Sequence, residues 1–167
     1  TRRVQELLKL RQASCSVYAD EIPKEEWKRI LLREGDRTDA ILVLGGDGTM
    51  LRAARDTADS QIPMLGINLG TLGYLTEVEK NGMEDAIDRL VAGSYQVEDR
   101  MMLCGQIYRQ GRMEEENSAL NDITITRCGH LRMLYFQIYV NGKLLKEYHA
   151  DGIIIATPTG STGYNMS

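Results

Sequence analysis

Cysteine is scarce in this 167-residue sequence, and its few copies are scattered. Cys15, Cys104 and Cys128 stand far apart and form no C-x-x-C pair and no Cys/His spacing. Their placement excludes the usual zinc and dithiol motifs. We therefore expect three reduced, mostly buried thiols and a cytoplasmic location.

Positive charge and long apolar runs are also missing. The net charge is −4, and no Lys/Arg run is longer than two residues, so nucleic acid is not an expected partner. No apolar stretch approaches the length that spans a bilayer, and no signal peptide opens the sequence, so we expect no membrane partner. Apolar content of 43% and charged content of 26% are ordinary for a folded globular chain.

Three common catalytic motifs are absent. There is no G-x-x-x-x-G-K-[ST] phosphate loop, and no G-x-G-x-x-G between a strand and a helix. The stretch 160–163 has the wrong spacing for a G-x-S-x-G nucleophile elbow. These absences exclude a lysine-bearing P-loop and a serine hydrolase of that type, and they do not support a hydride-transferring dinucleotide enzyme.

Glycine is the residue whose placement is informative. Nine of the 16 glycines fall in three short stretches: Gly45, Gly46, Gly48; Gly66, Gly70, Gly73; Gly152, Gly160, Gly163. Three unrelated tight turns would explain this clustering, but turns that meet at one ligand explain it better.

The first glycine stretch lies between a buried strand and a helix. Residues 39–44 are almost continuously apolar, and 49–59 have the spacing of an amphipathic helix. Glycine permits positive φ and close approach of a ligand, while a helix start offers N–H groups to an anion, so we predict a phosphate site here. Asp47 fits a general base or a ligand of phosphate-bound Mg²⁺, with a plain helix cap as the alternative.

The remaining pattern predicts α/β structure followed by mainly β structure. Helices are expected over 1–13, from Pro23 to Gly35 and from Asn81 to Gly93; strands are expected at 14–18, 39–44, 64–68, 97–107, 123–127, 134–140, 143–148 and 153–156. Residues 112–117 are polar enough for an exposed loop, and Asn141-Gly142 suits a two-residue hairpin turn. We place domains at 1–97, with a Rossmann-like parallel sheet, and at 98–167.

Several further side chains are candidates with open alternatives. Thr49 and Arg52 follow Asp47 by less than two helical turns, although Arg52 is equally a solvated arginine. Asn68 lies just past a strand end, where ligands sit in parallel sheets. Tyr74 is a stacking residue or a buried loop tyrosine. The hydroxyls at 157, 159, 161, 162 and 164 suit a polar ligand better than a plain turn.

Four segments, in this order along the chain, resemble the NAD kinase family. They are Gly-Gly-Asp-Gly-Thr at 45–49, Gly-Ile-Asn-Leu-Gly-Thr-Leu-Gly-Tyr-Leu at 66–75, Ala-Leu-Asn-Asp at 119–122, and Asp-Gly-Ile-Ile-Ile-Ala-Thr-Pro-Thr-Gly-Ser-Thr-Gly-Tyr at 151–164. Diacylglycerol and sphingosine kinases share the first segment, so it is weak alone. The last segment is very specific.

The resemblance implies transfer of the γ-phosphoryl group of ATP, or of polyphosphate, to the adenosine-ribose 2′-hydroxyl of NAD. Asp47 would accept the proton of that hydroxyl. Phosphate or ATP would meet Gly45, Gly46, Thr49 and Asn68. NAD would meet Gly48, Arg52, Tyr74, Asn121, Asp122, Arg132, His149, Asp151, Ser161, Thr162, Gly163, Tyr164 and Ser167.

The resemblance also implies a homo-oligomer and a β domain that continues past the last residue given. No carboxylate cluster marks a protein-built metal site, so we expect Mg²⁺, or another divalent cation, to be carried by ATP. The alternatives are a lipid kinase of the diacylglycerol or sphingosine type and a non-catalytic nucleotide-binding fragment.

Overall fold

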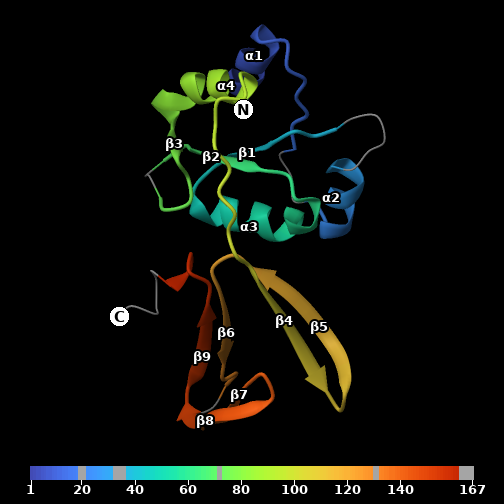
Figure 1. Cartoon of the computed structure of the whole chain (residues 1–167), viewed down its shortest axis with the longest axis vertical. Helices are drawn as coiled ribbons and strands as arrows, with labels where there is room; N and C mark the ends of the chain where they lie inside the picture. Colours follow the sequence, from blue (N-terminus) through green and yellow to red (C-terminus); the bar gives the residue numbers. More distant parts are fainter. Residues whose placement is uncertain (19–21, 32–36, 71–72, 130–131, 162–167) are drawn as a thin grey trace. The chain divides into compact units, whose positions relative to one another are not determined.

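The computed structural model describes the chain except for residues 19–21, 32–36, 71–72, 130–131 and 162–167. The chain divides into two compact units, Thr1–Asp99 (unit 1) and Arg100–Ser167 (unit 2). Unit 1 holds a parallel sheet with helices, and unit 2 holds antiparallel strand pairs (Figure 1). The predicted fold class is confirmed.

Unit 1 is built on a three-stranded parallel sheet. Its strands are β1 (Ile41–Leu44), β2 (Met64–Asn68) and β3 (Val78–Glu79), in that order across the sheet. Helix α3 (Asp47–Thr57) connects β1 to β2, which gives a βαβ unit, as a Rossmann-like parallel sheet requires. Two short 3₁₀ turns, Ala58–Ser60 and Lys80–Gly82, complete the connections.

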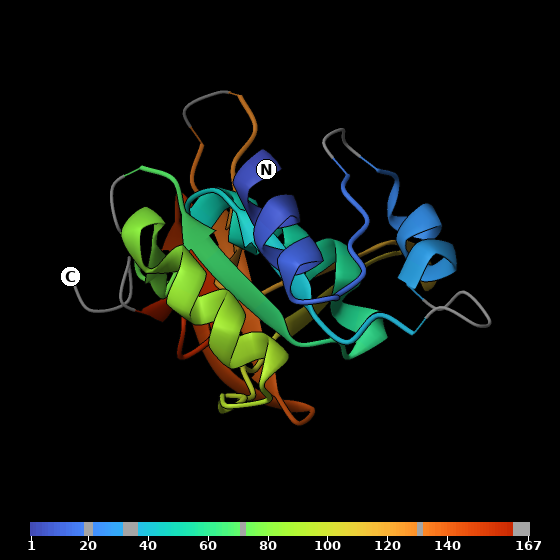
Figure 2. The same ribbon diagram turned by 90° about the horizontal axis from the view of Figure 1, so that it is seen from above.

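Helices cover both faces of this sheet. Helices α1 (Arg2–Leu10) and α4 (Met83–Val91) lie together on one face, and α3 lies on the other beside α2 (Lys24–Leu31) (Figures 1 and 2). Helix α4 ends as the sequence predicts, because Gly93 has a φ of +68° just past the helix and its N–H bonds to the carbonyl of Leu90. A sheet covered on both faces explains why its strands read as apolar runs.

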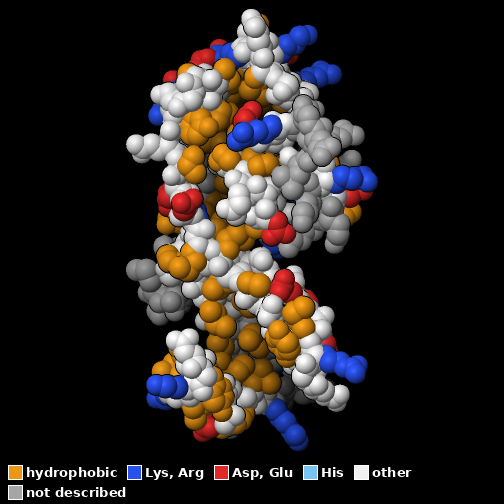
Figure 3. Space-filling model, turned by 45° about the vertical axis from the view of Figure 1, so that its right-hand side comes forward, with side chains coloured by type: hydrophobic (Ala, Val, Ile, Leu, Met, Phe, Trp, Pro, Cys, Tyr) orange, Lys and Arg blue, Asp and Glu red, His pale blue; other side chains and the backbone are white. Residues whose placement is uncertain are grey.

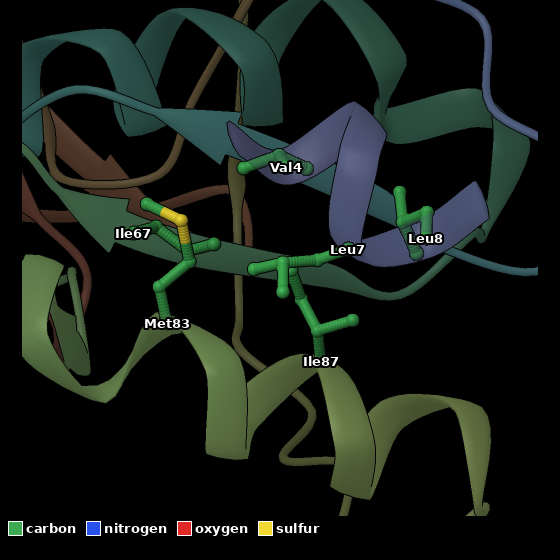
Figure 4. Close-up of a cluster of buried hydrophobic side chains, with 6 residues drawn as sticks. All are labelled: Val4, Leu7, Leu8, Ile67, Met83 and Ile87. Carbon is green, nitrogen blue, oxygen red and sulfur yellow. The ribbon is translucent and has the colours of Figure 1, made fainter. Parts of the chain in front are cut away.

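The core of unit 1 lies between α1, α4 and β2. Apolar residues at i, i+3 and i+4 form one stripe on α1, and residues at i and i+4 form another on α4. Ile67 of β2 lies between the two stripes and is fully buried (Figure 4). The cluster consists of Val4, Leu7, Leu8, Ile67, Met83 and Ile87.

Charged side chains join α1 to α4 at the rim of this core. The guanidinium of Arg11 pairs with Asp88 and lies 3.7 Å from Glu84, and Arg3 contacts Glu84 at 3.0 Å. The hydrogen bond from Arg11 holds the pKa of Asp88 below its ordinary value of 3.8. A carboxyl group with a lowered pKa stabilises the folded state above its unfolded pKa, and this stabilisation is lost as the pH falls through the folded pKa.

Replacing Asp88 by Asn is therefore expected to lower Tm at neutral pH by an amount that shrinks below about pH 4. The pair is exposed, so the effect is small and decreases with added salt. Thermal unfolding of both proteins between pH 3 and pH 7 checks this expectation. Asp85→Asn is the matched control, since Asp85 lies on the same helix and makes no ion pair with the described residues. A Tm difference that is the same at pH 3 and pH 7 would contradict the assignment.

The strands in the described part of unit 2 form three antiparallel pairs. Two are hairpins, β4 with β5 and β7 with β8, and the third joins β6 to β9. The strands are β4 (Leu103–Arg109), β5 (Arg112–Ala119), β6 (Asp122–Thr126), β7 (Leu134–Val140), β8 (Lys143–Ala150) and β9 (Gly152–Ala156). Asn141 and Gly142 have φ values of +50° and +75°, so the predicted two-residue turn is confirmed.

Five sequence predictions are wrong. The strand expected at 97–107 begins only at Leu103, as β4, and residues 97–102 form no strand. Residues 112–117 form strand β5 rather than a loop; both faces of the strand are exposed there, so no alternation marks it. Residues 14–18 form no strand. All three cysteines are exposed rather than buried. The helix after the glycine turn begins at Asp47, two residues earlier than expected.

Apolar side chains remain exposed on the strands of unit 2. Figure 3 shows them gathered over the hairpins. They include Ile107, Tyr108, Met113, Tyr135, Tyr139, Leu144, Leu145, Tyr148, Ile154 and Ile155. Of the helices in the described part of the chain, none combines the length and apolar character that a membrane crossing requires.

Candidate active site

The glycine turn lies at the carboxyl end of β1, as predicted. Gly46 is the N-cap of α3 and has extended backbone, with φ −98°. None of the three glycines at 45–48 has positive φ, so conformational freedom is not the reason for them. A Cβ at Gly46 or Gly48 would meet nothing within 4 Å, whereas one at Gly45 would collide with the side chain of Thr49. The turn therefore presents open backbone next to the first N–H groups of a helix, an arrangement that suits an anion.

Asp47 is held by a second loop, the one that connects β2 to β3, and not by its own helix. Its Oδ2 accepts the N–H of Tyr74 at 2.8 Å, and its Oδ1 accepts the N–H of Leu75 at 3.0 Å. The carboxylate makes no capping hydrogen bond, because Gly46 occupies the cap position. The helix-cap interpretation of Asp47 is thereby excluded, and two of the glycine-rich stretches meet at this carboxylate.

The second loop is fixed by buried polar contacts at the end of β2. Asn68 is only 2% exposed; its side-chain amide donates to the hydroxyl of Thr76 at 2.9 Å and accepts the N–H of Gly70 at 2.7 Å. Thr76 and Leu75 are buried as well. Asn68 thus supports the loop that carries the two N–H donors.

The other candidate side chains of unit 1 are exposed. Thr49 and Arg52 lie exposed on the first two turns of α3. The side chain of Tyr74 is 60% exposed, so it is not a buried loop tyrosine. The carboxyl ends of β1 and β2 therefore bring together Gly45, Gly46, Asp47, Gly48 and the loop through Tyr74, as parallel-sheet topology requires.

Unit 2 holds a second group of candidates where β6 and β9 meet. The hydroxyl of Thr157, which is 1% exposed, donates to the carbonyl of Leu120 at 2.5 Å, and its N–H donates to the carbonyl of Asn121 at 2.8 Å. A Cβ at Gly160 would overlap the backbone of Asn121. The side-chain Oδ1 of Asn121 is buried and has no hydrogen-bond partner in the described part of the chain. A buried acceptor of this kind usually receives a hydrogen bond, here from a ligand or a water molecule.

The hydroxyl-rich segment is partly used by the protein itself. Thr157 bonds to Leu120, and Ser161 donates to the carbonyl of Pro158 at 2.8 Å. The hydroxyl of Thr159 lies 3.5 Å from a guanidinium nitrogen of Arg100. At least two of the hydroxyls assigned to a ligand therefore stabilise the turn. Thr162, Gly163, Tyr164 and Ser167 lie outside the described residues.

The remaining described candidates of unit 2 are exposed or half-buried. Asp151 pairs with Arg127 at 3.1 Å, and the ring of His149 lies 5.1 Å from that of Tyr135. The neighbouring carboxylate of Glu147 raises the pKa of Tyr135. Arg132 is exposed, and Asp122 is half-buried and accepts the hydroxyl of Thr124 at 3.3 Å. Across the described residues, no three His, Cys, Asp or Glu side chains converge as a metal site would need.

Comparison with known proteins identifies the family. Residues 1–95 match the profile of the ATP-NAD kinase N-terminal domain, and residues 120–167 match that of the ATP-NAD kinase C-terminal domain. The chain belongs to the NAD kinase family. It is 58% identical over 130 residues to an NAD kinase of Agathobacter rectalis, covering 78% of this chain and 45% of the relative. It is 42% identical over 167 residues to an NAD kinase of Moorella thermoacetica, covering 100% and 51%. The chain spans about half the length of the curated relatives it matches.

Solved structures of NAD kinases have the same fold. An Archaeoglobus fulgidus NAD kinase in complex with ATP matches with a TM-score of 0.71 and 25% identity over 99% of this chain and 59% of that one. Yeast NADH kinase complexed with NADH matches with a TM-score of 0.70 and 30% identity, over 78% and 39%.

Three residues support the candidate side chains through contacts that the sequence did not indicate. They are Gly73, whose backbone faces the Asp47 carboxylate; Thr76, the buried partner of Asn68; and Gly160, which packs against Asn121. Gly73 and Gly160 contact residues far away along the chain, whereas Thr76 contacts Asn68, eight residues before it. The sequence shows a glycine or a threonine in a loop at each of these positions. It does not show which residue each of them contacts.

Proposed function

We propose that the protein containing this chain is an NAD kinase that transfers the γ-phosphoryl group of ATP, or of polyphosphate, to the 2′-hydroxyl of the adenosine ribose of NAD. The observation that carries the proposal is the position of the Asp47 carboxylate at the carboxyl end of the parallel strands. Two backbone N–H groups hold it there, and the glycine backbone beside it is open. The family membership and the names of the relatives support the choice of acceptor.

Asp47 is the general base of this proposal. Phosphoryl transfer depends on positioning and on neutralising charge, and a base orients the attacking hydroxyl. The helix start at Gly46 and the hydroxyl of Thr49 would receive phosphate through backbone N–H and hydroxyl donors. Gly45 would only line this turn, because its N–H already donates to the carbonyl of Ile67 at 3.0 Å. The buried Oδ1 of Asn121 would accept a hydrogen bond from NAD, which would satisfy an acceptor that is otherwise left unpaired.

Mg²⁺ belongs to this proposal as part of the ATP substrate. Magnesium retains several waters and is commonly held by substrate phosphates with one or two carboxylates. Asp47 lies in the first turn of α3, where phosphate is proposed to bind, and it suits one such contact better than a complete protein-built shell. Bound Mg²⁺ would neutralise charge on the transferred phosphoryl group.

A homo-oligomer in the cytoplasm completes the proposal. The apolar side chains exposed on unit 2 support an assembly, because large exposed apolar patches mark interaction surfaces. Three exposed free thiols fit a reducing compartment. Light scattering of the purified full-length protein measures the subunit number.

An acceptor comparison tests the proposed function. The full-length protein is incubated with MgATP and either NAD or diacylglycerol, and phosphorylated product is quantified. We expect NADP to form, no phosphatidic acid, and loss of activity when EDTA removes Mg²⁺ and recovery when Mg²⁺ is returned. Phosphorylation of the lipid alone would favour the lipid kinase, and no product from either acceptor would favour a non-catalytic domain.

A further inference from the structure

The loop that holds Asp47 has a glycine, Gly73, at the point where its backbone lies against the Asp47 carboxylate. A Cβ built on Gly73 would collide with all three atoms of the carboxylate group, Cγ, Oδ1 and Oδ2. The φ of Gly73 is not in the left-handed region, so other residues could adopt this backbone conformation. Glycine is therefore required here for space alone.

The requirement is specific to this position in the loop. Gly70 lies in the same loop, and a Cβ there would meet only the Oδ1 of Asn68 at 4.0 Å, an ordinary contact. The next two residues, Tyr74 and Leu75, supply the N–H groups that donate hydrogen bonds to the Asp47 carboxylate. The close approach of Gly73 is what brings both donors to hydrogen-bond distance.

The second donor residue and the residue after it are buried. Leu75 is 8% exposed and Thr76 is 2% exposed, and the hydroxyl of Thr76 accepts the buried amide of Asn68. Each carboxylate oxygen accepts one N–H and retains a second acceptor position, since an ionised carboxylate offers about four. The loop can therefore fix the direction of the carboxylate and still leave it able to take a proton from a substrate hydroxyl.

We propose that Gly73 is a positioning residue for the phosphoryl transfer, which fixes the Asp47 carboxylate through the N–H groups of Tyr74 and Leu75. This inference rests on the proposed function. Moving a reacting group by about 1 Å can reduce the rate roughly 10²-fold. Gly73→Ala should therefore reduce kcat about 10²-fold while the KM for NAD and for ATP change little.

Two variant cycles test the inference. In the first, Gly73→Ala is made in wild-type and in Asp47→Asn protein; the residual activity of Asp47→Asn should not fall further, because residues that act as a unit are not additive. In the second, Tm is measured for Gly73→Ala in wild-type and in Asp47→Ala protein. We expect a loss on the order of 5 °C in wild-type. The loss should nearly vanish in Asp47→Ala protein, where the three colliding atoms are absent.

Gly70→Ala is the matched control and should retain both activity and Tm. The inference is overturned if Gly73→Ala lowers the activity of the Asp47→Asn protein by the same factor as wild-type, if Gly70→Ala has an equal effect, or if the Tm loss is unchanged in Asp47→Ala protein. A wild-type protein without NAD kinase activity rejects the proposed function instead. The Tm cycle needs no activity and still decides whether Gly73 holds Asp47.

Discussion

Replacing Asp47 by Asn is expected to reduce kcat for NADP formation about 10³-fold while NAD affinity stays close to normal. A positioned general base contributes roughly 10²–10⁴-fold to a rate. Asparagine has nearly the same shape as aspartate, but its amide does not accept the proton of a hydroxyl. Its Oδ1 can still accept one loop N–H, whereas its NH₂ group faces the other donor.

Steady-state kinetics and equilibrium NAD binding on the full-length variant measure the two quantities separately. Asp59→Asn is a matched control, because Asp59 is an exposed carboxylate in the 3₁₀ turn at the other end of α3. It should behave as wild-type. Near-normal turnover of Asp47→Asn would reject Asp47 as the base, and loss of NAD affinity in step with kcat would make it a binding residue.

The position of Asp47, in the glycine turn between a strand and a helix, was predictable from sequence because its signals are local. An apolar strand, a turn of glycines around one carboxylate and a helical period lie within about twenty consecutive residues, 39–59. Parallel topology then fixes the edge of the sheet at which the turn must lie. The hairpin turn at Asn141-Gly142 was predictable for the same reason, since positive φ at both positions is a property of those two residues.

The features that could not be predicted from the sequence depend on contacts between residues that are distant along the chain. The N–H groups that hold Asp47 come from 27 and 28 residues further on, and backbone donors have no residue signature. Strand β5 was missed because alternation requires one buried face, and here six consecutive residues from Arg112 are exposed. The cysteines were misjudged because composition describes the average burial of a residue type, not its position on a strand edge or loop.

Gly160→Ala is the second change for which we expect a large effect. A methyl group at this position would overlap the backbone carbonyl of Asn121, which cannot rotate away as a side-chain end would. The segments at 120–122 and 157–161 would have to separate, and the bonds from Thr157 to Leu120 and Asn121 would lengthen. Overpacking of this kind costs about 1–3 kcal/mol. Under the proposed function it also displaces the Asn121 amide, so NAD affinity should fall by up to about 10²-fold.

Gly105→Ala provides the matched control within unit 2. Its Cβ would meet mainly the Cδ1 of Ile123, the far end of a flexible side chain, so a change of rotamer can relieve the contact. Denaturant unfolding and NAD binding of both variants should show a clear loss for Gly160→Ala and a slight one for Gly105→Ala. Because the collision at Gly160 is with fixed backbone, its cost should persist when Asn121 is also changed to Ala, which removes the side chain but not the carbonyl. Equal losses for the two glycine variants, or recovery of stability in the Asn121→Ala background, would mean that the backbone contact does not hold these segments together.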